Sequence, residues 1–283
     1  MTHTTTATLN VGDARLYYEV RGSGPLLLMI PGAPADAGSL AGLAAQLADR
    51  YTVVTYDQRG LSRSGLTGTA EDQHVPAFSE DAYRLITSLG AAPAYVVGTS
   101  GGALTGLDLI ARHPDRVRAL IAHEPPIPEL LTASARWRAT FQEVHDTYRT
   151  DGVGAAMLKF MATIDGGAPP VMPDPSQLPP EVLEMMGRIQ GNMDYFFSHV
   201  LLPVLSFEPD ISALRSASPR IVVGIGVTSP AGVPLDSARA LAELLDVKAV
   251  EFPGGHQGIA MDVGTSAELI HDALDHITAT DRS

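Results

Sequence analysis

Residues 94–103 have the sequence AYVVGTSGGA, in which the pattern G-x-S-x-G lies between an apolar run and a helical segment. The apolar run 94–97 predicts a strand, and residues 103–112 predict a helix. Ser100 would then occupy a tight strand-to-helix turn, where the two outer glycines avoid collisions with neighbouring backbone. This context predicts that Ser100 projects from the turn as a nucleophile. The alternative is a glycine-rich turn in which Ser100 only caps the helix.

The helix that follows Ser100 favours negative charge at this turn. Its first backbone N–H groups have no partner within the helix, and its dipole places partial positive charge there. We therefore expect the N–H of Gly101 to be one donor of an oxyanion hole.

The segments on either side of this turn repeat the order strand, helix, strand. Short apolar or β-branched runs predict strands, and helical periodicity lies between them, as in a parallel sheet. Segments 7–11 and 16–20, joined by Gly12-Asp13, predict an antiparallel hairpin. We expect an α/β protein with a mostly parallel eight-stranded sheet and helices on both faces. The remaining six strands are predicted at 26–30, 51–56, 94–97, 117–122, 220–225 and 247–252.

The predicted sheet is interrupted for about ninety residues after residue 124. This interval contains helical patterns at 135–148 and 181–205, separated by the proline-rich segment 168–180. We therefore expect a core made of residues 1–124 and 215–283, with a helical cap at 125–214.

Composition narrows the classes of partner. The 283 residues carry a net charge of −13, which opposes binding to nucleic acid or to anionic membranes. There is no cysteine, and the Thr-rich start has no signal-peptide pattern, so we expect a cytoplasmic protein that acts on a small molecule. Two lysines against many arginines and alanines suggest a GC-rich bacterial source. The sequence leaves the oligomeric state open.

Taken in order, these elements resemble those of the α/β-hydrolase family along nearly the whole chain. Residues 31–34, PGAP, are similar to the family's H-G-x-P loop, with Ile30 in place of the usual histidine. The resemblance implies that the backbone N–H of Ala33 is the second oxyanion donor. Residues 57–64, DQRGLSRS, are similar to a family segment that is chiefly structural.

A histidine follows the last predicted strand in the segment 252–256, FPGGH. The family places its catalytic histidine there, so the resemblance identifies His256 as the general base. An imidazole titrates near neutrality and can take a proton from serine and return it to a leaving group.

The acid partner of His256 is less obvious. The family's commonest acid position falls in residues 226–230, GVTSP, which contain no carboxylate. Glu124, at the end of the strand that follows the nucleophile helix, occupies the position that haloalkane dehalogenases use. We therefore expect Glu124 to orient His256, with Asp210 and Asp236 as weaker candidates. The alternative is that Glu124 only caps the sheet.

These residues predict a serine hydrolase that cleaves an ester, thioester, lactone or related carbonyl compound with no metal or organic cofactor. The same site could serve natural-product cyclisation or C–C cleavage, or the fold could bind a ligand without catalysis. Candidate substrate-binding residues are Ile30, His123, Trp137, Tyr195 and His199.

Overall fold

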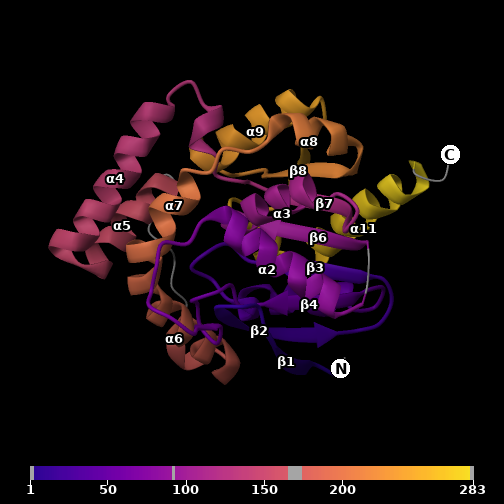
Figure 1. Cartoon of the computed structure of the whole chain (residues 1–283), viewed down its shortest axis with the longest axis horizontal. Helices are drawn as coiled ribbons and strands as arrows, with labels where there is room; N and C mark the ends of the chain where they lie inside the picture. The colour runs from indigo at the N-terminus through magenta and orange to yellow at the C-terminus, as the bar shows by residue number, and fades with distance from the viewer. Residues whose placement is uncertain (1–2, 91–92, 165–173, 281–283) are drawn as a thin grey trace.

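The computed structural model describes residues 3–90, 93–164 and 174–280. Within these residues nine strands form one sheet, in the order β1-β2-β4-β3-β6-β7-β8-β9, with β5 paired to β2 (Figure 1). The strands are β1 (Thr5–Asn10), β2 (Ala14–Arg21), β3 (Leu26–Ile30), β4 (Thr52–Tyr56), β5 (Gly65–Leu66), β6 (Ala94–Thr99), β7 (Val117–His123), β8 (Ile221–Gly226) and β9 (Val250–Phe252).

The sheet is mostly parallel, as predicted. Strands β4, β3, β6, β7, β8 and β9 pair in parallel, whereas β2 pairs antiparallel with β1, β4 and β5. The eight predicted strands and the hairpin at Gly12 are confirmed. The ninth strand, β5, was not predicted because two residues are too few to show a period of two.

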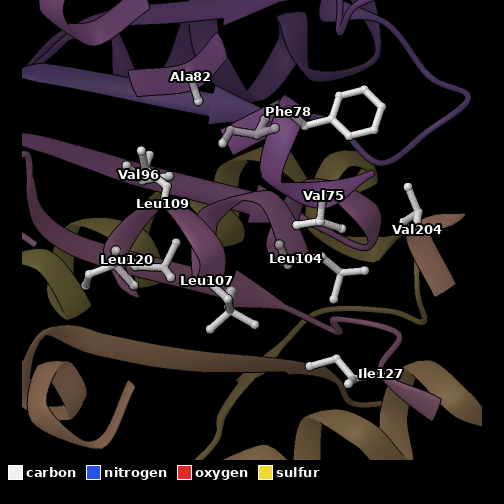
Figure 2. Close-up of a cluster of buried hydrophobic side chains, with 14 of the residues drawn as sticks. Val75, Phe78, Ala82, Val96, Leu104, Leu107, Leu109, Leu120, Ile127 and Val204 are labelled. Carbon is white, nitrogen blue, oxygen red and sulfur yellow. The ribbon is translucent and has the colours of Figure 1, made fainter. Parts of the chain in front are cut away.

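Along the central strands, side chains alternate between two hydrophobic clusters, one on each face of the sheet. Side chains of Val96 and Leu120 face one layer of helices, whereas Val97 and Ile121 face the other. Figure 2 shows Val96 and Leu120 in one buried cluster with Leu104 and Leu107 of α3. Helices α2 (Val75–Ser88), α3 (Gly101–Arg112) and α9 (Val233–Leu245) contribute to this first cluster, and α1 (Ala41–Leu47) and α11 (Val263–Thr280) to the second.

The register of the parallel strands brings four connections to one edge of the sheet. Ile30 pairs with Gly98, Thr99 with His123, and Gly226 with Phe252. The loops after β3, β6, β7 and β9 therefore leave the sheet side by side, at the carboxyl edge where α/β proteins bind ligands.

Helices are inserted between β7 and β8, on the left in Figure 1, and we refer to them as the cap. They are α4 (Ser134–Asp151), α5 (Val153–Ile164), α6 (Pro180–Tyr195), a π-helical turn (Phe196–Val200) and α7 (Leu201–Leu205). The next helix, α8 (Ile211–Ala217), packs on α3 and α9 of the core. The predicted boundary at residue 214 lies within this helix.

Part of the predicted proline-rich interruption, residues 168–173, lies outside the described residues. Across the described ranges, no helix combines the length and apolar character needed to cross a membrane.

Candidate active site

Ser100 occupies the turn between β6 and α3 in a conformation rare for a side-chain-bearing residue. Its φ is 52° and its ψ is −122°, and its backbone N–H donates to the carbonyl of His123 at 2.9 Å. A Cβ on Gly98 would lie 2.4 Å from the carbonyl oxygen of Gly102, and one on Gly102 would lie 2.2 Å from that of Ile30. Only glycine fits at these two positions, so surrounding backbone holds Ser100 in its strained conformation.

The loop after β3 lies directly against this turn. A Cβ on Gly32 would approach the Cβ of Ser100 to 2.8 Å, and the Gly32 N–H donates to the Thr99 hydroxyl at 3.2 Å. The backbone nitrogen of Ala33 lies 3.6 Å from where a Cβ on Gly101 would stand. The two backbone groups predicted to form an oxyanion hole are therefore neighbours beside Ser100.

Side chains from the core and the cap hold this loop in place. The buried Asp57 carboxylate accepts from the Ala37 N–H at 2.9 Å and forms a bidentate ion pair with Arg63, at 2.7 and 2.8 Å. From α6, the Asn192 amide donates to the Pro34 carbonyl at 2.8 Å. Groups of the protein itself thus hold the loop from both sides.

Glu124 and His256 meet at the same edge of the sheet. The Glu124 carboxylate has no solvent exposure, and its Oε2 lies 2.7 Å from Nδ1 of His256, which is 6% exposed. The other oxygen, Oε1, accepts from the Gly226 N–H at 2.9 Å. Burial pushes the pKa of Glu124 upward, but the interactions with His256, the Ser229 hydroxyl and the Gly226 backbone outweigh this and hold the pKa below its usual range. An ionised carboxylate at this position favours the imidazole tautomer that carries its proton on Nδ1.

The other two acid candidates start helices. Asp210 caps α8 by accepting from the Ala213 N–H at 2.9 Å, and Asp236 lies in the first turn of α9. Both positions complement the helix dipole. Ser229, in the family's commoner acid position, has its hydroxyl 2.6 Å from where a Cβ on Gly226 would stand, so it lies beside the backbone group that binds Glu124.

Two cavities meet at Ser100. The larger, of about 350 Å³, is lined by Ser100, Ala33 and His256 at its base and by the cap methionines Met157, Met161, Met185 and Met193. The smaller, of about 30 Å³, is lined by Ser100, Ala33 and Gly101 and by apolar residues of the cap, among them Phe196, Leu201, Val204 and Leu205. Each cavity is closed mainly by apolar side chains.

Two of the candidate substrate-binding residues lie on strand ends away from these cavities. Ile30 is fully buried in the core cluster on one face of the sheet. His123 is fully buried and meets the ring of Phe252 edge to face, with centroids 5.4 Å apart. Strand alternation turns both side chains into the protein, and neither lines either cavity.

The three cap candidates also lie elsewhere. Trp137 is partly buried against the main core cluster, and the ring of Tyr195 covers Gly60. His199 lies on the surface, with Nδ1 3.1 Å from a carboxylate oxygen of Asp72. As the described residues define them, the two cavities are not lined by these three side chains.

The cavity residues were missed because their pattern is that of ordinary packing. On α5, Met157, Phe160, Met161 and Ile164 form one helical stripe, and Met185, Ile189 and Met193 form another on α6. The spacing of these residues, i, i+4 and i+8 on α6, indicates a common face but does not tell a cavity from a core.

Among the described residues, no cluster of three or more histidine, aspartate or glutamate side chains is arranged to hold a metal ion. This edge of the sheet brings together a serine, an imidazole, a buried carboxylate and backbone donors.

Comparisons with known proteins agree with this architecture. A family model described as alpha/beta hydrolase fold matches residues 25–163. An uncharacterized hydrolase of Bacillus subtilis, YraK, is 36% identical over 274 residues, which cover 95% of each chain. Among solved structures, a thermophilic esterase from Thermogutta terrifontis aligns with a TM-score of 0.69 at 19% identity, over 98% of this chain and 99% of that one. A hydrolase from Pseudomonas aeruginosa aligns with a TM-score of 0.70 at 18% identity, over 95% and 98% of the two chains. The fold, the family match and the full-length relative together show that the chain belongs to the α/β-hydrolase family and is a hydrolase.

Proposed function

We propose that this enzyme is a serine hydrolase that cleaves an ester, thioester, lactone or related carbonyl compound. The observation that carries the proposal is the 2.7 Å hydrogen bond between the buried Glu124 carboxylate and His256, which lines the same cavity as Ser100. A nucleophile, a base and a residue that orients the base are the three parts that acyl transfer through serine requires.

The proposed reaction begins when Nε2 of His256 takes the proton of the Ser100 hydroxyl. The Ser100 Oγ attacks the carbonyl carbon, and the N–H groups of Ala33 and Gly101 donate to the oxygen that becomes negative. His256 then gives its proton to the leaving group as the bond to the acyl carbon breaks. Glu124 remains ionised throughout and stabilises the imidazolium.

Water completes the cycle. His256 removes a proton from a water molecule, which attacks the acyl-enzyme and releases the carboxylic acid. Overall, one water molecule is consumed, the bond to the leaving group is replaced by a bond to hydroxyl, and Ser100 regains its proton. No electron transfer takes place.

Covalent labelling with a fluorophosphonate tests this proposal. We expect the folded enzyme to gain one phosphonyl group, mapped to Ser100 by peptide mass spectrometry, and we expect Ser100→Ala to gain none. His256→Ala should be labelled much more slowly, because the hydroxyl loses its base. Absence of an adduct on folded wild-type enzyme would contradict the proposal.

A further inference from the structure

We propose that the two cavities divide the substrate: the small one holds a short acyl group, and the large one holds a bulky, uncharged, apolar leaving group. This inference rests on the proposed serine hydrolase activity and specifies its substrate class.

The position of His256 determines which cavity holds which part. A proton donated by His256 must reach the leaving-group atom, so the leaving group has to lie on the side that His256 occupies. His256 lines the large cavity, whereas the small cavity is lined by Ala33, Ser100 and Gly101 without His256 among its described residues. With the carbonyl oxygen directed at the N–H groups of Ala33 and Gly101, the acyl carbon chain points into the small cavity.

The small cavity limits the acyl group by its volume. About 30 Å³ corresponds to roughly two water-sized groups, enough for a methyl or an ethyl but not for a long chain. Its wall stands close to the oxyanion donors, because Cγ1 of Val204 lies 4.0 Å from where a Cβ on Gly101 would be. Leu201 and Leu205, which are 2% and 7% exposed, close the pocket from α7.

Two side chains of α5 lie between the two cavities. Phe160 and Ile164 of α5 line both of them, so their side chains form the wall between. The Phe160 ring packs edge to face on Phe196, with centroids 5.4 Å apart and planes at 70°. Phe196, which also lines the small cavity, is 4% exposed, so a buried ring supports Phe160 against displacement by a longer acyl chain.

The large cavity suits a bulky apolar group. Four methionines line it from the cap, and their unbranched side chains can adapt to leaving groups of different shapes. Apart from Ser100 and His256, the polar side chains in its lining are the uncharged Ser39, Thr99 and Gln257. Arg188, on the same helix as Met185, already donates to the Asp36 carboxylate at 2.6 Å. A charged leaving group would find no partner among the described lining residues.

Two isomeric esters give a direct test. Octyl acetate and methyl nonanoate contain the same atoms, but the long chain is on the leaving group in the first and on the acyl group in the second. We expect kcat/KM to be about 100-fold higher for octyl acetate, since a pocket too small by several methylenes rejects a substrate on at least this scale. Equal values, or a preference for methyl nonanoate, would overturn the division of the cavities.

Two variants test whether the small cavity determines the preference between the two esters. Leu205→Ala should enlarge the small cavity and shift the ratio of the two kcat/KM values at least tenfold toward methyl nonanoate. Leu158→Ala, which removes an exposed side chain of α5 that lines neither cavity, should leave the ratio within about twofold. If Leu205→Ala does not fold, Val204→Ala serves the same purpose. The comparison of the two esters on the wild-type enzyme does not depend on either variant. An equal shift in Leu205→Ala and Leu158→Ala would contradict the assignment.

Fluorophosphonate labelling separates the two levels of proposal. Labelled Ser100 together with a preference for long acyl chains overturns the division of the cavities and leaves the serine hydrolase intact. An enzyme that neither labels nor hydrolyses either ester contradicts the proposed function and, with it, this inference.

Discussion

The core side and the cap side of the site are built on different principles. On the core side, backbone contacts fix Ser100, Gly32 and Gly102 so closely that an added methyl would collide with carbonyl oxygens or with Ser100 itself. On the cap side, methionine, isoleucine and phenylalanine side chains close the cavities without a hydrogen bond to the reacting groups. The core side therefore tolerates almost no change, whereas the cap side can vary its side chains and with them its substrates.

Removal of the nucleophile should have the largest effect on activity. Ser100→Ala should lower kcat for p-nitrophenyl acetate by at least about 10⁴-fold, because it removes the atom that forms the acyl-enzyme. The hydrolysis rate, corrected for the uncatalysed reaction, measures this, and circular dichroism checks that the fold is kept. Activity within tenfold of wild type would show that another group attacks the substrate.

A pair of glycine substitutions compares the two sides directly. Gly102→Ala should abolish activity and lower the free energy of unfolding by about 3 kcal/mol or more, because its Cβ would lie 2.2 Å from the Ile30 carbonyl oxygen. The matched control is Gly187→Ala in α6, where an added Cβ meets nothing within 4 Å. Because residue 187 is exposed and helical, Gly187→Ala should raise the free energy of unfolding by about 0.5–1 kcal/mol. Urea unfolding measures both, and equal effects would refute the contrast between core and cap.

A carboxylate introduced at position 229 should restore part of the activity that Glu124→Gln removes. Glu124→Gln should reduce kcat by about 10²–10⁴-fold, because an amide cannot stabilise the imidazolium of His256. Adding Ser229→Asp should recover at least tenfold of that loss, since Ser229 lies beside Gly226, whose N–H binds Glu124. Ser229→Asn in the same background is the control, and recovery by both residues would rule out a charge effect.

Stability should depend on pH through His123, which is buried on the core side. Burial lowers the pKa of His123 from 6.5 to about 4, with the nearby His256 lowering it further and Glu124 partly opposing the shift. The unfolded chain therefore binds a proton between pH 6.5 and 4 while the folded chain does not, so stability falls as the pH decreases through this window, by about 3 kcal/mol. Unfolding curves of wild type and His123→Leu should differ in slope between pH 4 and 6.5. If stability changes with pH equally in wild type and His123→Leu, His123 is not the origin of the pH dependence.

Asn192 should have the smallest effect because it supports the site from the cap. It donates to the Pro34 carbonyl and accepts from the Ser62 N–H, at 2.8 and 2.6 Å. Asn192→Ala should reduce kcat about tenfold or less, with little change in the preference among esters, because it loosens the loop that carries Ala33 without touching substrate. A changed ester preference would instead indicate that Asn192 shapes a cavity.

Prediction from sequence succeeded where backbone geometry restricts residue type. The turn at Ser100 and the loop at Gly32 need glycine at fixed positions, so a short pattern between a strand and a helix identifies them. The strands were found because buried parallel strands are short apolar runs. Glu124 and His256 were predicted from their places after strands, and the parallel register brings those strand ends to one edge. Their catalytic roles stay predictions.

Prediction failed where only the direction of a side chain matters. Tyr195 and His199 are aromatic or polar cap residues, yet one covers Gly60 and the other pairs with Asp72. The stripes that begin at Met157 and Met185 line the large cavity, although their periodicity equally fits a packed core. Which apolar stripe faces a cavity depends on how the cap lies over the sheet, and no local pattern encodes that arrangement.

A double-variant cycle on Glu124 and His256 tests the central claim most directly. If Glu124 acts through the imidazole, kcat/KM of Glu124→Gln/His256→Ala should be no lower than that of His256→Ala alone, because without the imidazole the carboxylate has nothing to orient. If the two losses multiply instead, Glu124 and His256 act independently and the proposed serine, histidine and glutamate unit is wrong.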